Sequence, residues 1–288
     1  MSYQHDLKRH LADYKRLRLG ISERGVFRYR GRDVLRHHVL PLANASWNLL
    51  PEAEPTASAF LAAHPGKRHR YFRHLNSSQA FAFNLFFPYF SGQAQSASAL
   101  LRALGQEGIL AGWEPEAVPA PDEETNIDVS WTTTDGARTF CEVKLSEADF
   151  GKAADDARHR AKFIDIYRPL LATPKFIDIY RPLLATHLEP GRLESLAFFD
   201  AYQFNRNVWH MVRADRSRLI FLLPRTNAPL WTLLQDLLPG VLPRTRERIS
   251  AIAIEDVIAS ISADERCPRM LREYAEKLKQ KYIIQSAA

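Results

Sequence analysis

The chain has 288 residues, 46% of them hydrophobic and 11% aromatic, with a formal net charge of +6. This composition can fill the core of one large domain, or of one domain with appendages, and it excludes a disordered or fibrous protein. Cys141 and Cys267 are too few for a disulfide framework, and no apolar run approaches the roughly 18 residues of a membrane span. We therefore expect a soluble, cytoplasmic protein.

Positive charge is concentrated near the amino terminus. Residues 1–75 contain 14 Lys or Arg against 6 Asp or Glu, together with seven of the ten histidines. Such a segment is either a solvated basic face or an extension that contacts DNA or RNA, because cations on a protein displace counterions from phosphates.

The first elements are a helix, a hairpin and a loop. Apolar residues three and four apart over 2–19 predict a basic helix that ends at Gly20. Alternating apolar and basic residues over 25–35 predict a β-hairpin that turns around Gly31 and Arg32. Four prolines predict that 40–66 is largely loop, with a short helix near 56–63.

The rest of the chain mixes helices with strands. The aromatic segment 76–90 predicts a buried helix, which Asn76 or Ser77 can cap, and a second helix is expected at 97–104. The later predicted elements are, in chain order, strand 127–132, strand 138–145, helix 151–167, strand 219–223 and helix 272–282. This order predicts a mixed α/β fold.

A tandem repeat interrupts this pattern, because residues 162–173 recur letter for letter at 175–186. Two copies are too few for a solenoid, so the repeat is either a recent local duplication or an error in the recorded sequence. Its prolines make one unbroken helix through both copies implausible. We expect the extra copy to lengthen a loop or to add a broken helical turn.

Acidic residues on the two predicted strands carry the main chemical signal. Hydrolysis of a phosphodiester needs a divalent cation held by carboxylate oxygens, and Asp128 and Glu142 are the candidate ligands. Lys144 shares a strand face with Glu142 and can position or deprotonate the attacking water, or stabilise charge at the phosphate. The Val143 carbonyl is a further candidate ligand. The alternative is a solvated ion pair, although the neighbouring residues on the strand are apolar.

The length of the turn between the strands decides whether Asp128 belongs to this group. A two-residue turn at Asp135 and Gly136 would place Asp128 opposite Val143, pointing away from Glu142. A three-residue loop or a bulge shifts the register by one and brings Asp128 onto the face of Glu142. A metal site therefore predicts such an irregularity.

The chain resembles the PD-(D/E)XK nuclease superfamily, which has the restriction-endonuclease-like fold, and a bacterial subfamily within it. The similarity lies in the order of the predicted elements: a buried helix, the two strands with Asp128 and Glu142, a second helix and a further strand. The resemblance spans roughly residues 73–224 and depends on the segments 74–79 (HLNSSQ), 126–128 (NID), 141–147 (CEVKLSE), 150–151 (FG) and 202–207 (YQFNRN). It implies that Asp128 and Glu142 bind metal, that Lys144 is the catalytic lysine and that Gln79 orients a ligand or water. The chain lacks the proline that usually precedes the Asp.

The resemblance also implies an organisation and an activity. A restriction-endonuclease-like core, with a mixed central sheet flanked by helices, is expected at 71–225, after a basic extension at 1–70 and before a helical region at 226–288. The implied activity is a Mg²⁺-dependent endonuclease acting on DNA, in which Mn²⁺ can substitute for Mg²⁺. RNA as substrate and a homodimer remain open.

Four basic residues near the first buried helix are candidates for binding the DNA backbone: Lys67, Arg68, Arg70 and Arg73. Arg206 is either a phosphate ligand or part of an ordinary surface pair with Gln203, and Glu114 is either an additional ligand or an exposed strand-end residue. The alternative functions are a non-catalytic nucleic-acid-binding protein with a nuclease-like fold and a partner protein that docks its basic half on an acidic surface. Neither a Walker loop nor a Gly-x-Ser-x-Gly elbow occurs.

Overall fold

The computed structural model describes residues 2–120, 125–151 and 180–284, and its centre is a five-stranded mixed sheet in the order β3-β4-β5-β6-β7. The strands are β3 Leu110–Ala117, β4 Ile127–Thr133, β5 Arg138–Val143, β6 Ser217–Leu223 and β7 Ile249–Ala253. The pairs β3–β4 and β4–β5 are antiparallel, whereas β5–β6 and β6–β7 are parallel. The predicted α/β class with a mixed central sheet is confirmed.

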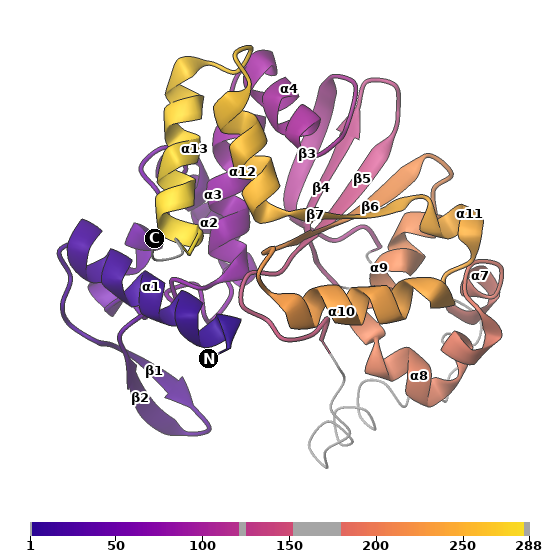
Figure 1. Ribbon diagram of the computed structural model, residues 1–288, viewed down its shortest axis with the longest axis horizontal. Coiled ribbons are helices and arrows are strands. Elements are labelled where there is room, and N and C mark those ends of the chain that lie inside the picture. Colours follow the sequence, from indigo (N-terminus) through magenta and orange to yellow (C-terminus); the bar gives the residue numbers. More distant parts are fainter. Residues whose placement is uncertain (1, 121–124, 152–179, 285–288) are drawn as a thin grey trace.

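Helices cover both faces of the sheet (Figure 1). One face packs against α3 Ser78–Phe90, α4 Ala94–Ala103, α12 Ile254–Ala263 and α13 Arg269–Tyr282. The other face packs against α8 Ser195–Asp200, α9 Tyr202–Val212 and α10 Ala228–Leu237. Alternation along each strand produces this division: Ile220 and Leu222 face the first layer, whereas Phe221 faces the second.

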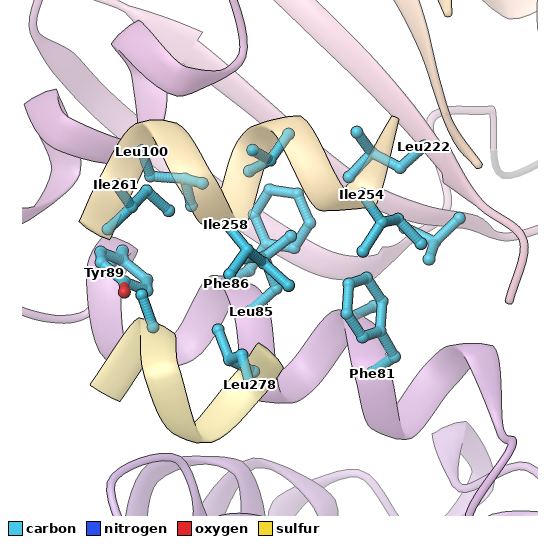
Figure 2. Close-up of a cluster of buried hydrophobic side chains, with 14 of the residues drawn as sticks. Phe81, Leu85, Phe86, Tyr89, Leu100, Leu222, Ile254, Ile258, Ile261 and Leu278 are labelled. Carbon is cyan, nitrogen blue, oxygen red and sulfur yellow. The ribbon is translucent and has the colours of Figure 1, made fainter. Parts of the chain in front are cut away.

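The first layer is an aromatic and aliphatic core. In Figure 2, side chains from α3, α12 and α13 point toward one another, among them Phe86, Ile258 and Leu278. The Tyr274 hydroxyl donates to the Asn84 carbonyl at 2.6 Å and so ties α13 to α3. Helix α3 begins after Ser77, whose hydroxyl accepts a hydrogen bond from the Ala80 amide, so Ser77 is the cap of the two that the sequence offered.

The N-terminal elements pack beside this layer. Leu7 and Leu11 of α1 (Tyr3–Arg18) belong to the same hydrophobic cluster as α13. Strands β1 (Gly25–Tyr29) and β2 (Arg32–Arg36) form a hairpin that lies beneath α1 and away from the central sheet in Figure 1. The turn is at Arg30 and Gly31, one residue earlier than expected, and both have positive φ as a two-residue hairpin turn requires. The division at residues 70 and 225 stays a prediction.

Short elements complete the described chain. They are η1 Leu42–Asn48, α2 Glu54–Ala63, η2 Pro65–Lys67, α7 Arg181–Leu184, η5 Pro190–Leu193, η6 Leu238–Gly240 and α11 Pro243–Arg246. The predicted helix at 151–167 and the first copy of the repeat lie outside the described residues, apart from Gly151. In the part of the chain that is described, no helix has both the length and the apolar character needed to cross a membrane.

Candidate metal and nucleic-acid site

A three-residue loop joins β4 to β5. The register pairs Val129 with Cys141, and the Thr133 amide donates to the Ala137 carbonyl at 3.0 Å, so the loop contains residues 134–136. Gly136, with φ of +80°, supplies the left-handed residue that such a loop uses. Continued by one residue, this register places Asp128 opposite Glu142. The predicted irregularity is therefore confirmed.

A third carboxylate joins this row from β3. The β3–β4 register pairs Pro115 with Val129 and Ala117 with Ile127, which places Glu116 opposite Asp128. Glu116 is buried and has a left-handed φ of +51°, whereas Glu114, the acidic residue considered from the sequence, is exposed. The sequence did not identify Glu116, because the register of β3 depends on the loop after it. Glu116, Asp128 and Glu142 thus occupy neighbouring positions on three adjacent strands.

Helix α9 fixes Glu142 and Lys144. Glu142 is 1% exposed, and its Oε1 accepts a hydrogen bond from Gln203 Nε2 at 2.5 Å and an ion pair from Lys144 Nζ at 2.8 Å. Its Oε2 accepts from Asn207 Nδ2 at 3.0 Å, and Lys144 Nζ also donates to Gln203 Oε1 at 2.8 Å. Gln203 and Asn207 are one helical turn apart, so they reach the same strand from one face of α9. The sequence did not identify Asn207 as part of this group.

Burial and mutual repulsion raise the pKa values of two carboxyl groups. Burial raises the pKa of Asp128 well above its usual range, and the charges of Glu142 and Glu116 add to this shift. A hydrogen bond of 2.7 Å from the Val143 amide to Asp128 Oδ2 offsets part of it. Burial also raises the pKa of Glu116. Burial therefore disfavours the charged forms of Asp128 and Glu116, although the charge of Lys144 offsets part of this effect at Asp128.

Lys144 keeps its proton in these surroundings. Burial alone would lower the pKa of Lys144, but the carboxylates of Glu142, Glu147 and Asp128 outweigh burial and raise it. Lys144 therefore presents a charged ammonium group beside the carboxylates at neutral pH.

Gln79 connects helix α3 to Glu116 and to the basic loop before it. Its Nε2 donates to Glu116 Oε1 and to the Lys67 carbonyl, both at 2.7 Å, and its Oε1 accepts from the His69 amide at 2.9 Å. Asn126 Nδ2 donates to Glu116 Oε2 at 3.0 Å. Gln79 therefore holds the carboxylate on β3 in place.

A pocket of about 500 Å³ opens over these groups. It brings together Asp128, Glu142, Lys144, Gln79, Lys67, Arg68 and Arg70 from the candidates of the sequence. Arg73 and Arg206 are not among its lining residues. Arg73 donates to the carbonyls of Leu40 and Val26 at 2.9 and 2.7 Å and so fastens the hairpin, and Arg206 donates to the Asn126 carbonyl at 3.1 Å.

The remaining motif residues meet around the same pocket. Asn76 Nδ2 donates to Ser146 Oγ, and Ser78 Oγ donates to Glu147 Oε1, both at 2.7 Å, so the start of α3 is tied to the segment that follows β5. Gly151 has a φ of +71°, and a Cβ atom there would lie 2.9 Å from Gln203 Oε1. The segments that the sequence singled out are therefore neighbours in space.

The side chains at this site offer few donors to a metal ion. Among the described residues, no group of three or more His, Cys, Asp or Glu side chains is arranged to hold one. Magnesium, however, is commonly bound through one or two carboxylates with water in its other positions. Asp128 and Glu142 match that smaller requirement, whereas Val143, the third candidate ligand, is buried and is not among the residues that line the pocket.

A helix-flanked, five-stranded mixed sheet with this arrangement is consistent with a restriction-endonuclease-like core. The chain belongs to the family described as "Restriction Endonuclease associating with ARP", whose family model matches residues 8–283. Comparisons with curated proteins and with solved structures gave no match. Membership of this family suggests a nuclease and implies DNA as its substrate.

Proposed function

We propose that the protein is a Mg²⁺-dependent nuclease of the PD-(D/E)XK type, an endonuclease that hydrolyses DNA phosphodiester bonds. The observation that carries this proposal is the row of Glu116, Asp128 and Glu142 on three adjacent strands, with the Lys144 ammonium 2.8 Å from Glu142. A binding module has no need for clustered carboxylates beside phosphate, because like charges repel.

Asp128, Glu142 and the Val143 carbonyl would hold the metal. Oxygen donors of this kind suit Mg²⁺, and Mn²⁺ accepts the same ligands. When bound, Mg²⁺ lowers the pKa of a coordinated water and neutralises negative charge at the scissile phosphate. A bound cation would also favour the charged forms of Asp128 and Glu116, whose pKa values burial raises.

The protein's own groups would orient the water and the phosphate. Because its pKa is raised, Lys144 acts as a hydrogen-bond donor that positions the attacking water or stabilises phosphate charge, in preference to a base. Gln203 bonds both Lys144 and Glu142 and so fixes the distance between them. The exposed cations of Arg68 and Arg70 would bind the DNA backbone at the edge of the pocket.

Plasmid cleavage tests the proposal. Wild type is compared with Lys144→Met, Asp128→Asn and the matched control Lys279→Met, which alters an exposed lysine on α13. In Mg²⁺ or Mn²⁺, wild type and control should cleave, and the two site variants should lose about 100-fold or more of the rate. Circular dichroism checks that each variant is folded.

The controls separate the other outcomes. Equal cleavage by all four proteins would indicate a contaminating nuclease or a different site. Salt-dependent DNA binding by a wild-type protein that cleaves with neither metal would favour the non-catalytic nucleic-acid-binding alternative.

A further inference from the structure

A second pocket lies beside the carboxylate pocket. It has a volume of about 610 Å³ and is formed by α1, the β1–β2 hairpin, residues 69–78 and residues 146–147 after β5. His69, Ser78 and Glu147 line both pockets, so the two are adjacent. A chain whose phosphate lies over the carboxylates can therefore place the adjoining nucleotide in the second pocket.

Aromatic rings form one wall of this second pocket. Phe27 and His74 have ring centroids 4.6 Å apart, Tyr71 and His74 are 5.0 Å apart, and Phe27 and Tyr71 are 6.2 Å apart. Tyr29 lines the same pocket and is 48% exposed. Phe27 and Tyr29 belong to the hairpin that projects from the core (Figure 1), and partly exposed rings offer a stacking surface for another planar group.

Cations and neutral imidazoles accompany these rings. Lys8 and Arg36 line the pocket, and the Arg70 guanidinium lies 4.4 Å from the Tyr71 ring centroid. Burial, with Arg73 and Lys8 adding to it, lowers the pKa of His74 to about 4, so its ring is neutral at physiological pH.

Two polar atoms of residues that line this pocket are buried and, among the described residues, unpaired. Within the described chain, His74 Nε2 and Asn76 Oδ1 have no hydrogen-bond partner. A wall of aromatic rings with flanking cations matches a nucleotide, which combines a flat base with a phosphate.

We propose that this second pocket binds an unpaired nucleobase of the strand whose phosphate lies over Asp128 and Glu142. This proposal rests on the proposed function and names its substrate class, single-stranded DNA or duplex DNA with a displaced nucleotide. A base inside a regular duplex is stacked and paired on both sides, so it cannot enter a pocket without leaving the helix.

Fluorescence binding measurements test this pocket. The probe is a single-stranded oligonucleotide with one 2-aminopurine, compared with the same strand in a blunt duplex, with Ca²⁺ in place of Mg²⁺ to avoid cleavage. The variants are Phe27→Leu and Tyr71→Leu, which remove a ring but stay apolar, and Tyr29→Leu as an exposed position. The control is Trp47→Leu, a 48% exposed aromatic residue outside the pocket.

Wild type should bind the single strand at least about tenfold more tightly than the duplex and should quench the 2-aminopurine. Each pocket variant should weaken single-strand binding by about five- to 100-fold, the range expected for loss of one base-aromatic stack, while the control leaves it unchanged. Thermal melting verifies folding, and Tyr29→Leu serves if a more buried variant unfolds.

The outcomes separate this proposal from the proposed function. Equal affinity for both probes, or pocket variants that behave like Trp47→Leu, would overturn the base pocket even if plasmid cleavage is confirmed. The protein could instead prefer single strands in a way that depends on Phe27 and Tyr71 but cleave DNA with neither metal. That result would support the base pocket and refute the proposed nuclease activity.

Discussion

Replacement of Asp128 by Asn should stabilise the metal-free protein while abolishing its response to Mg²⁺. Asn is nearly the same shape as Asp, and its side-chain oxygen can still accept the hydrogen bond from the Val143 amide. The substitution removes one of three carboxylates that occupy neighbouring positions on adjacent strands. It therefore removes repulsion without creating a cavity.

The size of the effect follows from sheet geometry. Directly opposite residues have Cβ atoms about 5 Å apart, and two unit charges at that distance repel by about 3 kcal/mol at an effective dielectric constant of about 20. The Lys144 ammonium offsets part of this repulsion, since its charge also acts on Asp128. We expect Asp128→Asn to raise the free energy of unfolding in EDTA by about 1–2 kcal/mol.

Urea denaturation followed by circular dichroism measures both effects. Mg²⁺ at ten times its dissociation constant should raise the free energy of unfolding of wild type by about 1.4 kcal/mol and leave Asp128→Asn unchanged. Asp33→Asn, which removes an exposed carboxylate on β2, serves as the control and should stay within about 0.5 kcal/mol of wild type in either buffer. A variant less stable than wild type in EDTA, or one that gains equally from Mg²⁺, would refute the reasoning.

Three further predictions concern groups away from the carboxylates. Burial lowers the pKa of Lys281 to about 7, below its value in the unfolded chain. The free energy of unfolding of the wild type should therefore rise from pH 7 to 10 by up to about 1.4 kcal/mol per pH unit. Urea denaturation should show that Lys281→Met lacks this pH dependence. Burial and, to a smaller extent, nearby cations lower the pKa of His38 to about 3. Between pH 6.5 and 4 the histidine is therefore protonated in the unfolded chain but not in the folded one, so acidification over this range should lower the free energy of unfolding by about 3 kcal/mol. Urea denaturation of His38→Phe should show a smaller decrease. Gly151→Ala should lower stability by about 1 kcal/mol and displace Gln203, which should reduce the cleavage rate about tenfold. Gly136→Ala is the control, because Gly136 also has a positive φ but no atom lies within 4 Å of a Cβ there. Thermal melting and cleavage assays should show that the control loses stability but keeps its cleavage rate.

The sequence predicted the elements whose pattern is local. Helix 2–19, helix 76–90 and strand 219–223 each appear in the structure, because apolar spacing and flanking residues define them without help from distant contacts. The shared face of Glu142 and Lys144 was predictable for the same reason, since side chains two apart on a strand point the same way. The three-residue loop between β4 and β5 was predictable because a metal site requires Asp128 and Glu142 to share a face.

The sequence could not predict contacts that depend on register or on packing between distant segments. Glu116 reaches the site only through its pairing with β4, and β3 also contains the exposed Glu114, so residue type alone did not distinguish them. Asn207 contributes through the position of α9 over β5, and α9 is 65 residues further along the chain. Strand β7 and helix α12 follow residue 225, in the segment that was expected to be a helical region.

The two faces of β5 have opposite consequences for stability, and this division explains how such a site can be tolerated. Glu142 and Lys144 lie on the face toward α9, where burial of carboxylates raises the pKa of Asp128 and works against folding. Cys141 and Val143 lie on the other face, within the apolar cluster formed by α3, α12 and α13. Burial of that large apolar surface stabilises the same strand on which the charges lie. A substitution in this apolar layer should therefore lower activity through loss of folded protein, whereas Asp128→Asn should lower activity while the fold becomes more stable.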